Sequence, residues 1–241
     1  MAANKLEKAL YGPSLVEVIL GAILGLLVGV LVACVYLVFR PVQTVPAMPK
    51  EPLRNVVYYI PGVDSNAKGK SWQAKHQQFL AGGRVSLVED ELNEWASSLK
   101  MPTAAAPAAP AKPAKPAKPG EKPEPPKAPA PDGFVIPSKP NFRIANGKLQ
   151  IGMQCTLNWY GVMTDVTLQA TGGLQKDGDA FVFVPETVYL GSCPLHLLPM
   201  IPGLLVSHIS AYEPVADDFK AAWAKLTDVK IEGSTLKLAG P

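Results

Sequence analysis

The sequence has few of the residues that usually carry catalysis, metal binding or disulfide bonding. Its 241 residues include three histidines and three cysteines. No two histidines have the i, i+4 spacing of a helical zinc site. No arrangement of Ser, Cys or His indicates an activated nucleophile. We therefore expect no enzyme activity, no catalytic residue, no metal and no cofactor.

Charge of one sign and phosphate-binding loops are also scarce. The net charge is +3, and five lysines lie in a proline-rich tract, so we expect no nucleic-acid partner. Gly69-Lys70-Ser71 matches only the end of a phosphate-binding loop. The first glycine of that motif belongs at position 64, which is Asp64, and Gly62 lies two residues too far upstream. We interpret this stretch as a polar turn before a helix.

A long apolar run is present at residues 14–39, with Glu17 as its one acidic residue. A bilayer core needs about 20 apolar residues of helix, so the run predicts a transmembrane helix after a tail of residues 1–13. Leu31-Val32-Ala33-Cys34 resembles a bacterial lipoprotein signal, but apolar residues continue past Cys34. The run is also longer than the roughly 7 to 15 residues of a signal-peptide core, so we favour an uncleaved anchor.

Small residues recur every four positions in this run, at Gly21, Gly25 and Gly29. On a helix they form a stripe that lets a second helix approach closely, which indicates a homo-oligomer. The alternative is that glycine is simply common in membrane helices.

The orientation of the span does not follow from charge, because lysines or arginines flank both ends. A long domain can translocate despite its charge. We therefore expect a cytoplasmic tail, a single pass through the inner (cytoplasmic) membrane, and a periplasmic, extracytoplasmic carboxy-terminal domain.

Two segments follow the span before any long strand. Residues 40–100 form a membrane-proximal segment with helical character at 71–80. Within it, Ser86-Leu87-Val88-Glu89 has the spacing of a capping box and predicts a helix over 86–99. Residues 101–133 are rich in Pro, Ala and Lys. Proline removes amide donors and favours polyproline II, so this tract is interpreted as an extended, solvated spacer.

Residues 134–241 alternate between apolar and polar positions over long stretches. Strands are predicted at 149–159, 162–175 and 180–190, a hairpin turn at Asn146-Gly147, a helix at 215–226 and a closing hairpin over 229–238. The predicted fold class is α+β, with a curved antiparallel sheet and helices on one face.

Two further features of this domain leave alternatives open. Cys155 and Cys193 could pair in an oxidising compartment, or be two separate buried thiols. Residues 195–209 are apolar almost all round and predict a buried helix. One face of it carries Leu198, Ile201, Leu205 and Ile209. This face is either packed core or the wall of a site for an apolar ligand.

Two motifs together resemble known sequences. The first is 86–93, with its Glu91-Leu92-Asn93 signature, and the second is 188–195, a strand that ends in glycine before an apolar segment. They resemble the YpmS-like membrane-anchored bacterial proteins and the TULIP-like lipid-binding half-barrels. The proline-rich insertion departs from that pattern, and it leaves open whether the helix over 86–99 packs with the later sheet.

The resemblance implies an envelope protein that binds or shields a lipid-like ligand, with membrane lipid as its partner. It implies no catalytic residues. The alternative is a scaffolding subunit whose partner is another envelope protein. A dry apolar groove would favour the first hypothesis and a filled core the second.

Overall fold

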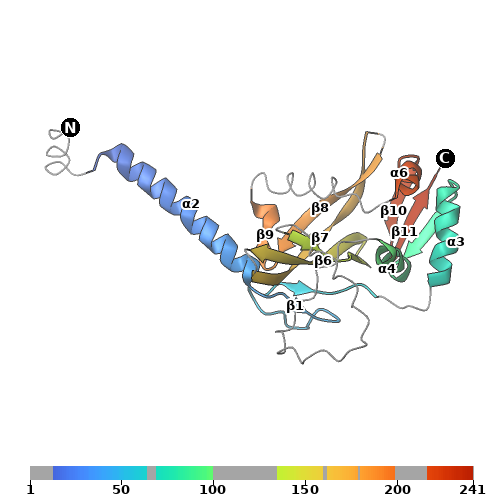
Figure 1. Cartoon of the computed structure of the whole chain (residues 1–241), viewed down its shortest axis with the longest axis horizontal. Helices are drawn as coiled ribbons and strands as arrows, with labels where there is room; N and C mark the ends of the chain where they lie inside the picture. Colours follow the sequence, from blue (N-terminus) through green and yellow to red (C-terminus); the bar gives the residue numbers. More distant parts are fainter. Residues whose placement is uncertain are drawn as a thin grey trace, which may run out of the picture.

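The computed structural model describes residues 13–63, 69–99, 135–159, 162–178, 180–198 and 216–240. The chain is α+β. An amino-terminal apolar helix is followed by antiparallel sheets and a few helices (Figure 1). The predicted fold class is therefore confirmed.

Helix α2, Leu15–Phe39, extends away from the rest of the molecule (Figure 1). Ser14 caps it: the Glu17 amide donates to Ser14 Oγ (3.3 Å), and the Ser14 amide donates to a Glu17 carboxylate oxygen (3.2 Å). Glu17 thus satisfies an amide at the helix end, where an acid also suits the helix dipole. The helix is long and apolar enough to span a membrane.

The central sheet has the strand order β4-β6-β7-β8-β9, and β5 also pairs with β6. Its strands are antiparallel: β4 Val135–Pro137, β5 Asn141–Ala145, β6 Lys148–Trp159, β7 Val162–Asp177, β8 Ala180–Leu190 and β9 Cys193–Pro194. The predicted turn joins β5 to β6, with positive φ at both Asn146 and Gly147. Such φ angles match the twist of the flanking strands. The predicted long strands are confirmed.

A second sheet joins residues from both sides of the proline-rich tract. It has the order β10-β11-β3, from β10 Asp228–Glu232, β11 Thr235–Ala239 and β3 Val85–Val88. The predicted closing hairpin is β10–β11, and β3 pairs antiparallel with β11.

The predicted capping box at Ser86 is wrong. Ser86 lies in β3 opposite Lys237, and helix α4 begins three residues later, as Glu89–Ser98. Val85 and Leu87 alternate with exposed Ser86 and are each 4 % exposed, so burial of this strand face outweighs the local cap. The Glu91 carboxylate accepts the Val88 amide at 3.1 Å and so satisfies the start of α4.

The remaining elements are short. Helix α3, Gly69–Leu80, begins two residues before the predicted helical stretch 71–80. Helix α6, Asp217–Trp223, lies within the predicted helix 215–226. Strands β1 Gln43–Thr44 and β2 Tyr58–Tyr59 form a parallel pair. The predicted helix over 195–209 begins as a single 3₁₀ turn, Leu195–Leu197; residues 199–209 lie outside the described residues.

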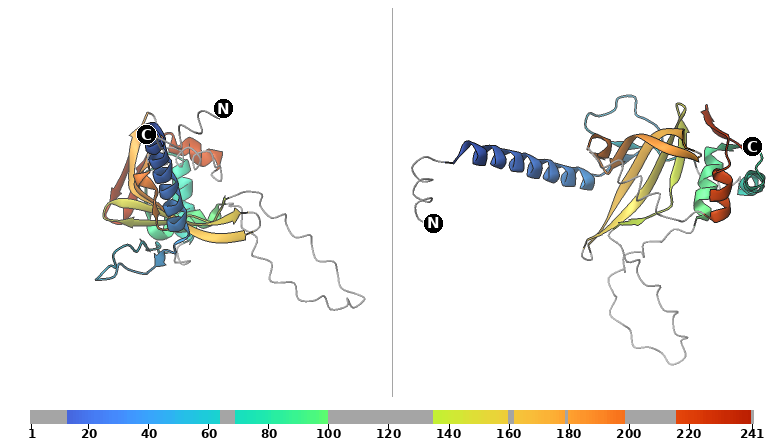
Figure 2. Two further views of the ribbon diagram at one scale, coloured as in Figure 1. Left: turned by 90° about the vertical axis from the view of Figure 1, so that its left-hand side faces the viewer. Right: turned by 90° about the horizontal axis from the view of Figure 1, so that it is seen from above.

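The division between residues 40–100 and 134–241 needs correction, because both contribute to one core. Trp72, Phe79 and Leu92 pack in the same cluster as Leu149 and Leu236. Helices α3, α4 and α6 lie together at the end of the central sheet away from α2 (Figure 2). The helix that follows β3 does therefore pack with the later sheet.

The proline-rich tract does not separate two bodies. The described residues on its two sides are in contact, since the Lys139 ammonium donates to the Ser97 carbonyl at 2.7 Å. Residues 100–134 themselves lie outside the described residues. The predicted extended spacer therefore lies outside the part of the chain that the structure describes, and the segments before and after it belong to one core.

The last turn of α2 is fixed to the turn between β8 and β9. The Ser192 amide donates to the Leu37 carbonyl (2.9 Å), and Ser192 Oγ donates to the Arg40 carbonyl (3.2 Å). Gly191 has a φ of 58°, and a Cβ there would lie 2.1 Å from the Val38 carbonyl oxygen. Only glycine allows both this φ and this approach.

Candidate apolar ligand site

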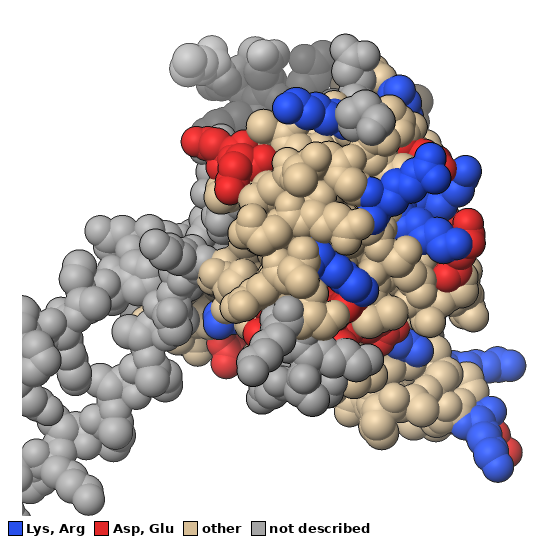
Figure 3. Space-filling view, turned by 90° about the vertical axis from the view of Figure 1, so that its right-hand side faces the viewer, with Lys and Arg blue, Asp and Glu red and all other residues tan. Residues whose placement is uncertain are grey.

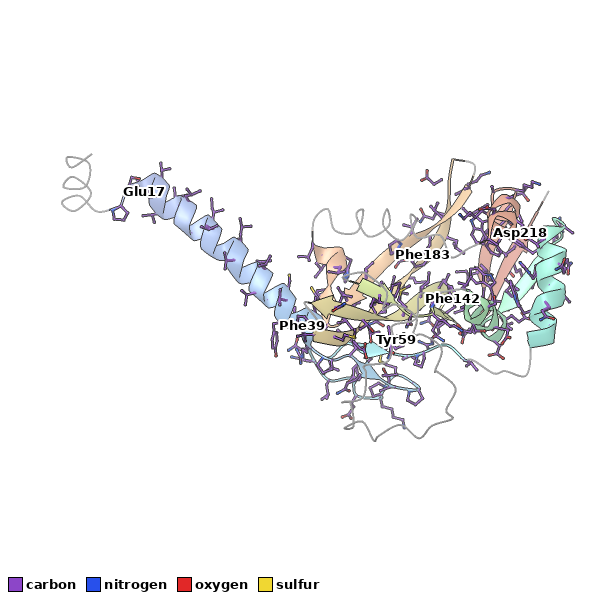
Figure 4. The ribbon with its side chains drawn as sticks, viewed as in Figure 1. Glu17, Phe39, Tyr59, Phe142, Phe183 and Asp218 are labelled. Carbon is purple, nitrogen blue, oxygen red and sulfur yellow. The ribbon has the colours of Figure 1, made fainter. Side chains whose placement is uncertain are left out.

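A cavity of about 510 Å³ lies between the helices and the two sheets. Helices α3, α4 and α6 contribute its large side chains, Trp72, Leu92, Trp95, Phe219 and Trp223. The amphipathic pattern of each helix turns these residues inward. Figure 4 places Phe142 among the dense side chains between the central sheet and these helices, with Asp218 farther out on α6.

The two sheets supply the rest of the wall. Leu149 and Ile151 come from β6, Leu174 from β7, and Phe181 and Phe183 from β8. Leu174 and Phe183 are direct partners across the β7–β8 ladder, so both side chains leave the sheet on the same face. The second sheet adds Leu87, Leu236 and Leu238.

Aromatic rings form a continuous row along the helical side of the cavity. Trp95 stacks on Phe219 with centroids 5.0 Å apart, and Phe219 stacks on Trp223 at 6.1 Å. Trp72 and Phe142 flank Trp95 at 6.2 and 5.9 Å. These distances fall in the range of favourable aromatic pairs. Several of the rings are only partly buried although they pack on the core, because one side of each faces the cavity.

Polar groups are rare in this wall. The Trp223 indole N–H donates to the Phe181 carbonyl at 2.8 Å, so it is already satisfied. Of the described residues that line the cavity, Lys220 is the one that carries a charge. Figure 3 shows the end of the domain away from α2, where charged side chains surround a broad uncharged region.

A buried carboxylate holds α3, β3 and α4 together behind the cavity. Glu91 is 2 % exposed and accepts hydrogen bonds from Ser71 Oγ (2.6 Å), Lys75 Nζ (2.7 Å) and the Val88 amide (3.1 Å). Burial alone would raise the pKa of Glu91, but these hydrogen bonds and the Lys75 charge outweigh it and lower that pKa below its ordinary value.

Asn93 fixes α4 to β5. Its side-chain NH₂ donates to the carbonyls of Val63 and Phe142, each at 2.9 Å, and its oxygen accepts the Phe142 amide at 2.6 Å. The side chain of Phe142 lines the cavity. Glu91 and Asn93 of the Glu91-Leu92-Asn93 signature are therefore structural residues that position the cavity wall.

The residues predicted for a ligand site lie elsewhere or outside the described part of the chain. Leu198 is half-buried and packs with Val188, Cys193 and Leu195 near the end of α2, away from the cavity. Ile201, Leu205 and Ile209 lie outside the described residues. No sequence signal pointed to the cavity. Trp95 lies in the predicted helix over 86–99, and Phe219 and Trp223 lie in the predicted helix at 215–226, where apolar residues fit a packed core equally well.

The cysteines are free thiols. Cys155 and Cys193 are both buried and unbonded, which agrees with the alternative of two separate thiols. Cys193 lies instead beside Cys34 of α2. Burial raises the pKa of each of Cys155 and Cys193 to about 11, so both are neutral and weakly nucleophilic near pH 7.

The glycine stripe of α2 contacts no other part of the described chain. A Cβ added at Gly21, Gly25 or Gly29 would meet nothing within 4 Å. The stripe is therefore open to a second helix, and the homo-oligomer stays a prediction.

Within the described ranges, no group of three or more His, Cys, Asp or Glu side chains could hold a metal ion. Comparison with protein-family models, with curated proteins and with solved structures found no match. The cavity itself therefore carries the functional argument.

Proposed function

We propose that this chain is a single-pass protein of the cell envelope whose extracytoplasmic domain binds a lipid-like apolar ligand in the cavity. The observation that carries the proposal is the cavity wall, in which sixteen of the seventeen described lining residues are apolar. A volume of about 510 Å³ lies within the ~300–1,000 Å³ of typical small-molecule pockets.

The apolar wall of the cavity favours an apolar ligand over water. The cavity opens to solvent, so without a ligand its apolar side chains are in contact with water, which is unfavourable. A ligand that covers this wall gains about 25 cal/mol for each Å² of apolar surface that it removes from water. Water is a poor filler here, because it needs two to four polar partners and the wall offers few.

The candidate membrane helix supports a location of this site near a membrane. Helix α2 supports a single pass, and the helices that line the cavity, α3, α4 and α6, lie at the opposite end of the domain (Figure 1). The inner membrane, the cytoplasmic tail and the extracytoplasmic domain are part of the proposal, on the ground that a long domain can translocate despite its charge. A reporter that is active only in the cytoplasm, fused after residue 241, should be inactive.

Ligand entry can be followed by tryptophan fluorescence, because three of the four tryptophans line the cavity. A fatty acid brominated along its chain should quench the detergent-solubilised protein, whereas the same acid without bromine should not. Native mass spectrometry of the purified chain should also show co-purified lipid.

A matched pair of variants separates a ligand cavity from a packed core. Ile151 lines the cavity and is half-buried, whereas Ile144 lies in the same core at 4 % exposure and does not line it. Ile151→Trp should block a fluorescent fatty-acid probe with little loss of stability. Ile144→Trp should overpack the core and cost roughly 1–3 kcal/mol or more, as measured by urea unfolding.

The scaffold alternative makes the opposite prediction. If the wild type binds no probe, and if Ile151→Trp destabilises as strongly as Ile144→Trp, the cavity is filled by the chain itself. The ligand-binding proposal would then be abandoned in favour of a structural subunit.

A further inference from the structure

The polar part of a ligand has one favourable position in this site. Within the described part of the chain, every buried side-chain nitrogen or oxygen already has a hydrogen-bond partner. A polar ligand group placed deep among the Leu, Phe and Trp side chains would therefore lose its hydrogen bonds to water and gain none. The apolar part of the ligand must lie inside, and its polar part must stay where water reaches.

Lys220 lies at such a border. It lines the cavity, yet its side chain is 40 % exposed, so its methylene stem covers apolar wall while its ammonium reaches solvent. It comes from α6, next to the wall residues Phe219 and Trp223. A cation in this place favours a negatively charged ligand group at the border between the cavity and water.

The contact of Lys220 with Asp217 is easily exchanged. Lys220 Nζ lies 3.7 Å from Asp217 Oδ1, and the Asp217 side chain is 98 % exposed. Exposed pairs of this kind contribute about 0–1 kcal/mol. A ligand acid group could therefore take the place of Asp217 at little cost, while Asp217 returns to water.

We propose that the cavity selects anionic amphiphiles: the hydrocarbon chain lies among the aromatic rings and the acid group pairs with the Lys220 ammonium. This specificity rests on the proposed function. The shared chemistry is one long apolar chain that ends in a carboxylate or phosphate, from a free fatty acid or a singly acylated phospholipid.

Hexadecanoic acid and hexadecan-1-ol provide the test, because they share a chain and differ in the charge of the head. Binding to the full-length protein in neutral detergent is measured by displacement of the fluorescent probe at pH 8. The wild type should bind the acid about fivefold more tightly than the alcohol. Lys220→Gln should remove this preference by weakening the acid alone. Lys225→Gln, just past α6 and outside the cavity wall, should keep it.

The outcomes separate the two proposals. If neither compound binds, the proposed function fails. If both bind the wild type equally, and Lys220→Gln changes neither, the cavity binds lipid but the charge specificity is wrong. Hexadecyl phosphate, run in parallel, distinguishes the source: tighter binding than the carboxylate indicates a phospholipid, and weaker binding a free fatty acid.

Discussion

Removal of the Lys75 ammonium should expose how the domain stabilises a buried charge behind the cavity. Lys75→Met keeps most of the side-chain length and deletes the charge. Glu91, at 2 % exposure, would keep only Ser71 Oγ and the Val88 amide as partners. The Ser86 carbonyl would also lose the hydrogen bond that Lys75 Nζ donates at 2.6 Å.

The size of the effect follows from the burial of each partner. Removal of one member of a buried ion pair typically costs about 3–5 kcal/mol. Here the Lys75 side chain is 31 % exposed, and two other donors remain on Glu91, so the cost should be smaller. We expect Lys75→Met to lower the free energy of unfolding at pH 7 by about 2–3 kcal/mol.

The pH dependence gives a sharper signature. In the wild type the folded-state pKa of Glu91 is lowered, so its stabilisation is present above the unfolded pKa of about 4.3 and lost as the pH falls through the folded value. In Lys75→Met, the hydrogen bond and the charge of Lys75 no longer oppose burial, so the folded-state pKa of Glu91 rises. The variant carboxyl then takes up a proton on acidification, so the gap in stability between wild type and variant should shrink from pH 7 to pH 4.

Urea unfolding followed by circular dichroism at both pH values tests this reasoning. Lys148→Met is the matched control, because Lys148 pairs with Glu186 on the surface, at 46 % and 53 % exposure. The control should change the free energy of unfolding by less than about 1 kcal/mol. A Lys75→Met gap that is equal at pH 7 and pH 4, or no larger than that of the control, would refute the role assigned to the Glu91 charge.

Three other changes test the junction, the span and the proline-rich tract. Gly191→Ala should lower the melting temperature by several degrees, because its Cβ would meet the Val38 carbonyl. Gly173→Ala is the control, because a Cβ there would meet nothing within 4 Å, and it should leave the melting temperature unchanged. Equal melting temperatures for the two variants would contradict the close approach at Gly191. Gly25→Leu should reduce crosslinking between copies in membranes, and an unchanged yield would show that the stripe is only composition. Deletion of residues 111–119 should leave the melting temperature nearly unchanged, and a large fall would show that this tract packs on the domain.

The sequence predicted the central sheet well because its signal is local. Alternation at Leu149, Ile151 and onward reports one buried face, and Asn146-Gly147 fixes the hairpin without help from distant residues. The two long strands that follow extend the same period. Local patterns of this kind survive folding because the buried face and the backbone propensity favour the same structure.

The sequence failed where two local signals competed. Ser86-Leu87-Val88-Glu89 has the spacing of a helix cap and also the alternation of a strand. The choice depends on β11, about 150 residues later, whose backbone pairs with Val85–Val88. No window around Ser86 contains that partner, so the cap was predicted and the strand was missed.

The cavity was unpredictable for a related reason. Its wall combines three helices and two sheets, and each element by itself shows only an ordinary apolar face. A packed core and an open cavity need the same residue types at the same spacings. Only the distances between elements separate them, and those distances follow from contacts such as Asn93 to Phe142 across the proline-rich tract.

The position of the cavity relative to the membrane depends on the junction at Gly191, not on the length of the proline-rich tract. Ser192 joins the β8–β9 turn to Leu37 and Arg40 at the end of α2, and β8 runs from that turn to the cavity wall at Phe183 and Phe181. One strand therefore connects the anchor to the site. The described residues on the two sides of the tract are in contact, since the Lys139 ammonium donates to the Ser97 carbonyl, and the connection through β8 does not include the tract. The proposed binding site is thus held at a fixed distance from the anchor, at the end of the domain that faces away from α2.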